Sequence, residues 1–346
     1  MAIASNPGDD TDERSAERCL DEGRRHDLAG RMDKAVECYA AAIDSAAGGP
    51  SSRVRAEAFR RLGVLHHRKA EPEAARECCR RSLDAAVAAE LPDLAAEALN
   101  ALGGFAFEHG KLAEARASFV RALELAAGDV SVIGKVEENL GIIDSAQGHW
   151  ESALMHYGRA LDACERAHDT RGCAIAYHNL GMLHADQRQW QQADAHYRDC
   201  QRLAQAVADV HLTALAALNR AEVQAALGQY AGARTLVERA LRAFTRLGAR
   251  RDLAGAHRLA GVVSRALDQP TLAESHLRSA VEVARAADCP LAEADAWRDL
   301  AELYRERGRV KEAQSFLLEA RRTYQMLGAQ HEVADMDERM LACQVA

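Results

Sequence analysis

One column of small residues returns along this chain at an almost constant interval, and it restricts the possible folds more than any other feature. The spacing is 40 residues at every step except one, where it is 38. A fixed period of this length indicates tandem copies of one supersecondary unit, each packing on its neighbours. The column consists of Gly23, Gly63, Gly103, Gly141, Gly181, Ala221, Gly261 and Ala301.

Further columns describe the unit itself. Twelve positions after the first column every copy has an alanine, and nineteen positions after it every copy has Ala, Ser or Cys. A glycine often stands seven positions after the column, as at Gly30 and Gly110, where a left-handed residue would end a helix. Pro72 and Pro270 fall at the first turn of the following helix, where a missing N–H costs nothing. We therefore predict two closely packed helices per copy.

Composition agrees with an all-α fold. The chain is rich in Ala, Leu, Arg and Glu, with 5% aromatic residues and six prolines, which favours helix over strand. We predict a disordered tail over residues 1–13, eight repeats over 14–328, and a capping helix over 329–346 with Val333, Met336, Met340 and Leu341 on one stripe. The expected repeats span about 14–53, 54–93, 94–131, 132–171, 172–211, 212–251, 252–291 and 292–328.

Two segments carry a family resemblance. GMLHADQRQWQQADAHYRDC (residues 181–200) and GGFAFEHGKLAEARASFVRAL (residues 103–123) show a small residue in the first helix, an aromatic in the second and the paired small residues. This pattern resembles the tetratricopeptide repeat, and the period of 40 resembles its long-helix branch, which includes kinesin light chains and bacterial peptide-sensing regulators. The resemblance implies a right-handed α-α superhelix whose first helices line a concave, protein- or peptide-binding surface.

Charge and motifs argue against several other functions. The net charge is −8 with both signs interspersed, so no basic patch for nucleic acid is expected. No apolar run reaches membrane-spanning length and the N-terminus does not resemble a signal peptide, so we expect a cytoplasmic protein. We find no nucleophile, phosphate-loop or zinc motif, and predict no enzyme activity, no cofactor and no metal site. The preference for Arg over Lys, 39 against five, suggests a bacterial source.

Asparagine is the unexplained residue of the repeats. Outside the N-terminal tail, the chain has Asn100, Asn139, Asn179 and Asn219, at spacings of 39, 40 and 40. The last three stand two places before the small-residue column, in the middle of a first helix, where Asn costs about 0.5–0.7 kcal/mol relative to Ala. An amide can pair with both the N–H and the C=O of an extended peptide, so we predict that the four form a ladder that grips a partner's backbone. The alternative is that they bond the neighbouring repeat and fix the stacking.

Other residues on the same faces are candidates for specificity. These are His178, Met182, Asp186, Glu222, Arg258 and Arg298. The two arginines could hold an acidic group, although Asp295 and Asp299 nearby could neutralise them. The main prediction is a non-enzymatic scaffold or adaptor that binds another protein or a peptide segment. The alternatives are a sensor that changes superhelical pitch on binding a small peptide or metabolite, and self-association as a homodimer.

Overall fold

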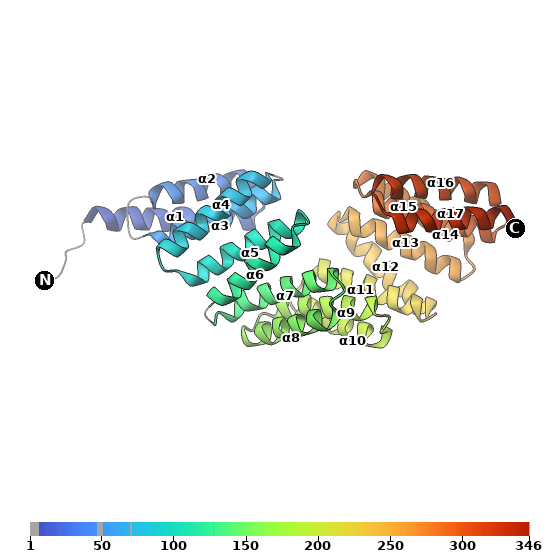
Figure 1. Ribbon diagram of the computed structural model, residues 1–346, viewed down its shortest axis with the longest axis horizontal. Coiled ribbons are helices and arrows are strands. Elements are labelled where there is room, and N and C mark those ends of the chain that lie inside the picture. Colours follow the sequence, from blue (N-terminus) through green and yellow to red (C-terminus); the bar gives the residue numbers. More distant parts are fainter. Residues whose placement is uncertain (1–6, 47–50, 70, 127, 346) are drawn as a thin grey trace. The chain divides into compact units, whose positions relative to one another are not determined.

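The computed structural model describes residues 7–46, 51–69, 71–126 and 128–345. Over these residues the chain forms seventeen α-helices and no strand, which confirms the predicted all-α repeat fold (Figure 1). The chain divides into an N-terminal unit, residues 1–172, and a C-terminal unit, residues 173–346. No helix in the described part combines the length and the apolar character that a bilayer crossing requires.

The N-terminal unit is a stack of four helix pairs, each joined by a short turn. Its helices are α1 (Pro7–Leu28), α2 (Met32–Ser45), α3 (Ser52–Arg68), α4 (Pro72–Ala88), α5 (Pro92–Glu108), α6 (Leu112–Leu125), α7 (Val130–Ala146) and α8 (Trp150–Arg166). The predicted tail over residues 1–13 is wrong for residues 7–13, because α1 begins at Pro7; residues 1–6 lie outside the described part. Proline suits a first helical position, because the N–H it lacks would have no partner within the helix there.

The C-terminal unit continues the same architecture. It contains most of α9 (Thr170–Asp186), followed by α10 (Trp190–Ala206), α11 (Val210–Ala226), α12 (Tyr230–Leu247), α13 (Arg250–Ala266), α14 (Pro270–Ala286), α15 (Pro290–Glu306), α16 (Val310–Met326) and α17 (Gln330–Val345). The helix α17 has no second helix of its own and packs on α16, burying Met336 and Cys343. Leu341 was expected on the buried stripe but is exposed, since five residues from Met336 turn it about 140° around the helix.

The small-residue column marks where the two helices of a repeat touch. The residue sixteen places later in the second helix lies directly against the glycine, so a Cβ built on Gly103 would stand 2.5 Å from Cε1 of Phe119. Gly141 meets Tyr157, and Gly181 meets Tyr197, in the same way. A ring can lie this close only to a residue without a side chain, so the glycines are required by packing.

The turns use left-handed residues at nearly every helix end. Gly30, Gly110, Gly148, Gly228 and Gly308 have positive φ, as the column seven places after the small residue predicts. At two of these turns the chain has Arg188 and Asp268 in place of glycine, and they adopt the same conformation, with φ of 57° and 56°. The turns between repeats use it as well, at residues such as Ala208 and Gly248. The backbone geometry of the turn is therefore kept even where the favourable residue is missing.

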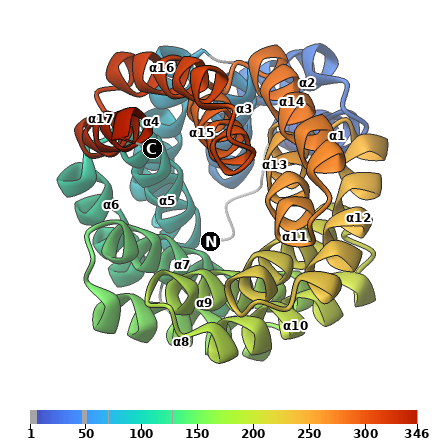
Figure 2. The same cartoon turned by 90° about the vertical axis from the view of Figure 1, so that its right-hand side faces the viewer.

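Within each unit the first helices of the repeats lie on the inner side of the stack. Successive first helices contact one another, as α3 does α5, α5 does α7 and α13 does α15. Figure 2 shows α5 and α7 inside α6 and α8 in the N-terminal unit, and α13 and α15 inside α14 and α16 in the C-terminal unit. The first helices therefore form an inner face in each unit, and this is the surface that the asparagines occupy.

Candidate binding surface on the first helices

The inner face of the N-terminal unit is hollowed between α3, α5 and α7. The pocket has a volume of about 300 Å³, and Asn100 and Asn139 both line it. Its walls combine apolar residues, among them Val64, Phe105 and Val132, with charged ones. Two of the four predicted asparagines are therefore brought together at one cavity.

Asn100 and Asn139 are bonded to each other. The Nδ2 of Asn139 donates to the Oδ1 of Asn100 over 2.9 Å, and both side chains are half-buried. This bond joins α5 to α7 and thus one repeat to the next. It still leaves the Oδ1 of Asn139 as an acceptor and the Nδ2 of Asn100 as a donor, because each amide has more bonding capacity than one hydrogen bond uses.

The charged residues of the pocket are mostly paired within the protein. The Nε of Arg60 lies 2.9 Å from Oε2 of Glu97, and the Nε2 of His67 lies 3.2 Å from Oε1 of Glu108. Lys135, which also lines the pocket, forms no ion pair with any described residue. Lys135 was not among the residues predicted from sequence, although it precedes Asn139 by four places and therefore shares its helix face. The pocket thus has one cation without an internal counter-ion.

In the C-terminal unit the third and fourth asparagines are also bonded to neighbours. The amide of Asn219 bonds Nε2 of His178 over 3.0 Å, joining α11 to α9. Asn179 hydrogen-bonds His178 as well. Burial lowers the pKa of the His178 imidazole, and the bond to Asn179 partly offsets that effect by raising it. His178 was expected to line the groove, but it is buried, with its ring centroid 5.8 Å from that of Tyr197. Most of the His178 ring therefore packs in the repeat core, and its contact with a ligand stays a prediction.

Met182, Asp186 and Glu222 are exposed on this inner face. The two carboxylates lie close enough to Tyr197 to raise the pKa of its hydroxyl, after burial, which is the larger cause. Partial desolvation of its carboxylate raises the pKa of Asp186. Asp186 and Glu222 therefore place two carboxylates on the surface around Tyr197.

The two arginines predicted to form a basic stretch are paired internally. Arg258 lies 3.0 Å from Asp299 and 3.6 Å from Glu222. Arg298 lies 3.1 Å from Asp295 and donates to the hydroxyl of Tyr324 over 3.2 Å. The acidic neighbours noted in the sequence thus hold both guanidinium groups, and the surface is one of mixed charge.

One register rule connects these contacts. In three neighbouring pairs of repeats, the residue three places before the column bonds the residue two places before the column of the next repeat. The pairs are Asn100 with Asn139, His178 with Asn219, and Arg258 with Asp299. The asparagines therefore sit at a lateral pairing position that polar residues of several kinds fill.

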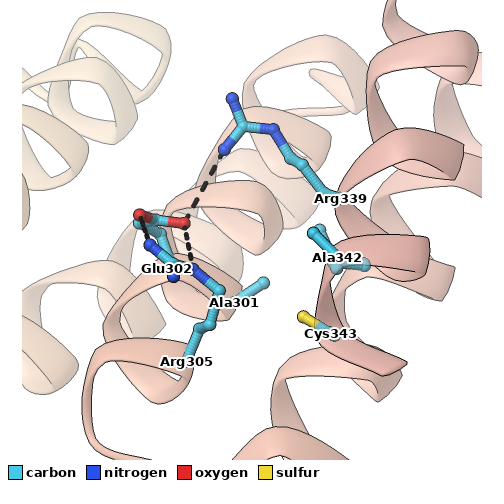
Figure 3. Close-up of a pocket in the computed structure, with 7 residues that line it drawn as sticks. Ala301, Glu302, Arg305, Arg339, Ala342 and Cys343 are labelled. Carbon is cyan, nitrogen blue, oxygen red and sulfur yellow. Dashed lines mark hydrogen bonds and ion pairs between the residues drawn. The ribbon is translucent and has the colours of Figure 1, made fainter. Parts of the chain in front are cut away.

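A second cavity lies near the C-terminus, between α15, α16 and α17. It has a volume of about 230 Å³ and is lined by Ala301, Glu302, Arg305, Leu317, Arg339, Ala342 and Cys343. Figure 3 shows Arg305 and Arg339 both directed at the carboxylate of Glu302, at 2.6 Å and 3.7 Å. This cavity was not predicted from sequence, because it exists only where the capping helix meets the last repeat.

Buried charge in the fourth repeat was also missed. Asp144 and Glu137 are both buried on α7, and His156 of α8 bonds Glu137 while its Nε2 lies 3.5 Å from Asp144. Arg116 and Ser152 donate to Asp144 as well. The serine bonds the aspartate and not the histidine, so the arrangement lacks the serine–histidine contact of a nucleophile and its base. The cluster joins α6, α7 and α8.

Comparison with protein families gives matches to the tetratricopeptide repeat over residues 20–86 and, in three overlapping segments, over residues 94–166, 132–206 and 172–246. The sequence search found no curated protein with a significant match. Solved structures match in fold, at sequence identities that support no more than the fold.

Three of these solved structures show how much of the chain the similarity covers. The apo form of RapI is 15% identical, with 78% of this chain and 97% of that chain aligned at a TM-score of 0.61. A Rap protein complexed with competence and sporulation factor is 12% identical, with 96% of this chain and 98% of that chain aligned at a TM-score of 0.62. A signal transduction ATPase with a tetratricopeptide repeat sensor, from Pyrococcus horikoshii, is 15% identical, with 95% of this chain but only 50% of that protein aligned at 0.71.

Proposed function

Because the chain belongs to the tetratricopeptide repeat family, we propose that it is a non-enzymatic scaffold that binds an extended segment of a partner protein, or a peptide, on the inner face of its first helices. The observation that carries the proposal is the bonded pair of Asn100 and Asn139 on the wall of the 300 Å³ pocket in the N-terminal unit. In this proposal the amides of the predicted ladder are held in place by a neighbouring side chain.

A bonded pair of amides is suited to a peptide backbone. The Oδ1 of Asn139 accepts from a backbone N–H, and the Nδ2 of Asn100 donates to a backbone C=O. The bond between them fixes both side chains before the ligand arrives, so less rotamer entropy is lost on binding. A backbone grip of this kind is independent of the ligand's side chains, which leaves specificity to the rest of the pocket.

The rest of the pocket favours a segment with an acidic side chain. Lys135 has no internal counter-ion, whereas Arg60 and His67 already face Glu97 and Glu108. A carboxylate from the ligand pairs with Lys135, and the apolar walls around Phe105 receive an adjacent aliphatic side chain. The expected ligand is therefore an extended, mixed acidic and apolar segment.

The test begins with selection of linear peptides from a phage-displayed random library on the full-length protein. A selected peptide is then titrated by fluorescence anisotropy against the wild type, an Asn100→Ala/Asn139→Ala variant and a Lys135→Met variant. Lys34→Met is the matched control, because Lys34 is exposed on the second helix α2 of the same unit. Circular dichroism confirms that each variant is folded.

We expect the selected peptides to be enriched in Asp and Glu, and the affinity to fall by about tenfold or more in both pocket variants but not in the control, which corresponds to about 1.4 kcal/mol. Selection of peptides that bind every variant equally would mean that the asparagines serve stacking only. Failure to select any peptide would count against the whole proposal.

A ligand-responsive sensor is the second candidate, favoured by the fold similarity to a Rap protein in complex with a factor and to a tetratricopeptide repeat sensor. The two functions differ in what the ligand does to the chain. Small-angle scattering with and without a selected peptide separates them, since a sensor requires a change in the radius of gyration and a passive scaffold does not.

A further inference from the structure

One contact recurs in the fourth, fifth, seventh and eighth repeats, and a different pair of side chains makes it in each. The residue four places before the small-residue column faces the residue fifteen places after it, across the two helices of the repeat. Glu137 and His156 bond each other in this way, and Trp297 and Phe316 stack at 5.3 Å between ring centroids. In the seventh repeat the position is filled by two histidines, His257 of α13 and His276 of α14.

The two imidazoles meet through the same ring atom. The Nδ1 of His257 lies 3.2 Å from the Nδ1 of His276, with the ring centroids 5.4 Å apart and the planes at 40°. One Nδ1 must carry a proton to donate to the other in this arrangement. The same separation is close to that of two adjacent nitrogens on one metal ion. For metal–nitrogen bonds of about 2.05 Å this is about 3.3 Å in a tetrahedral site and about 2.9 Å in a square-planar or octahedral one.

The surroundings favour neutral imidazoles with access to solvent. Burial lowers the pKa of both rings, and each ring is nevertheless partly exposed. A pocket of about 60 Å³ between α12, α13 and α14 adjoins His276 and has both Glu238 and Arg234 on its wall. Glu238 is near enough to act on the pKa of His276, which it raises. Neutral imidazole is the form that binds metals, and a carboxylate nearby offsets part of an ion's charge.

We propose that His257 and His276 form a binding site for a single divalent transition-metal ion that imidazole favours, such as Ni²⁺ or Zn²⁺. Both Nδ1 atoms coordinate the ion and water fills the remaining positions. The proton held between the rings moves to the Nε2 of the same ring through solvent, so ion binding releases no net proton from the pair. The coordinated ion joins α13 to α14 within one repeat.

The proposed site has only two protein ligands, and this number determines the affinity for the metal ion that we expect. Among the described residues no group of three or more His, Cys, Asp or Glu side chains is arranged to hold a metal ion. Two imidazoles that are already in place lose little rotamer freedom on chelation, but they give a weaker and more exchangeable site than the four-ligand structural sites of zinc proteins. The site is therefore one that responds to the metal supply and not one that is required for folding.

The fifth repeat provides an internal control. His184 and His196 also lie together, but their rings stack in parallel, with centroids 5.1 Å apart and an angle of 7° between planes. Stacked rings point their nitrogens along parallel planes instead of at a common point. A His184→Gln variant should therefore leave metal binding unchanged.

The experiment is isothermal titration of NiCl₂ into untagged, EDTA-treated full-length protein, together with thermal unfolding followed by circular dichroism. The test variants are His257→Tyr, which reproduces the Tyr177 and His196 pair found at the equivalent positions of the fifth repeat, and His276→Phe, which places at this position the phenylalanine that the eighth repeat has there. Both replacements use side chains that this fold already accommodates.

We expect one Ni²⁺ per chain, and a rise in Tm of about 2–4 °C at roughly ten times the Kd. Affinity should fall about tenfold or more in each test variant and stay unchanged in His184→Gln. Wild-type protein that binds no Ni²⁺, or that binds it no better than the two test variants do, would overturn the proposal.

Discussion

Two adjacent glycines in α5 allow a direct test of why the small-residue column exists. Gly103 belongs to the column, and a Cβ there would stand 2.5, 2.7 and 2.9 Å from three atoms of the Phe119 ring. Gly104 is the next residue in the same helix, and a Cβ there would meet nothing within 4 Å. The Gly103→Ala and Gly104→Ala variants therefore share the same chemistry and the same helix and differ only in the neighbour.

The two substitutions are expected to change the free energy of unfolding in opposite directions. Replacing a helical glycine by alanine stabilises by about 0.5–1 kcal/mol, because the unfolded chain loses backbone freedom. Gly104→Ala should show that gain. Gly103→Ala has the same gain but must displace a ring that is almost fully buried, and overpacking of this kind costs about 1–3 kcal/mol. The free energies of unfolding of the two variants should differ by about 1–3 kcal/mol, in favour of Gly104→Ala.

The assay is urea unfolding followed by circular dichroism at 222 nm and, as a second probe, intrinsic fluorescence. A third variant strengthens the test, because the eighth repeat has Ala301 opposite Leu317 at these positions. Gly103→Ala combined with Phe119→Leu copies that pair, and it should be less destabilised than the sum of its single changes. If Gly103→Ala and Gly104→Ala unfold at the same urea concentration, close packing against the second helix is not the reason for the column.

Three further outcomes are expected. Ala208→Gly should stabilise the C-terminal unit by about 1 kcal/mol in the same urea assay, since Ala208 has φ of 55° and glycine adopts that conformation without strain; an unchanged midpoint would contradict this. Burial alone would raise the pKa of Asp144, but hydrogen bonds from Ser152 and Arg116 lower it below its ordinary value. The stabilisation from these bonds is therefore present at neutral pH and is lost as the pH falls through the folded-state pKa. In Asp144→Asn, the free energy of unfolding should decrease less steeply as the solution is acidified. Burial lowers the pKa of His178 in the folded protein, so below the ordinary histidine pKa of about 6.5 the unfolded state binds more protons than the folded state. Stability therefore falls as the pH drops below about 6.5. His178→Gln should reduce the loss in urea midpoint between pH 7 and pH 5.5.

The helices, their pairing and most turns could be predicted from sequence because they follow from periodic packing. Each small residue of the column must face a side chain of the second helix, so the same interval recurs wherever the contact recurs. The turns between repeats were harder to predict. They adopt the same left-handed geometry, but Glu90, His168 and Ala208 occupy it in place of glycine, so composition gave no signal there.

The site was predicted less completely, because its chemistry depends on which side chains meet between repeats. The sequence places Asp295 and Asp299 near Arg298, as observed, yet it does not show that Arg298 also donates to the hydroxyl of Tyr324. Likewise, the buried cluster of Glu137, Asp144 and His156 stands at positions where the other repeats have both apolar and polar residues. Charge at such a position is informative only once its partners are known.

The position of Asn100 shows that part of this pairing follows from the spacing of the residues in the sequence. It stands one place earlier in its repeat than the other asparagines, and this misalignment is what brings it to Asn139. Side chains on successive first helices meet at one residue more than the repeat period. Where the period is 40 the partners are 41 apart, as in His178 with Asn219 and Arg258 with Asp299; where it is 38 they are 39 apart, as in Asn100 with Asn139. An asparagine in strict register would have met a different residue, so the proposed ladder depends on offset pairing. The Asn100 and Asn139 pair both joins two repeats and leaves a donor and an acceptor for the inner face.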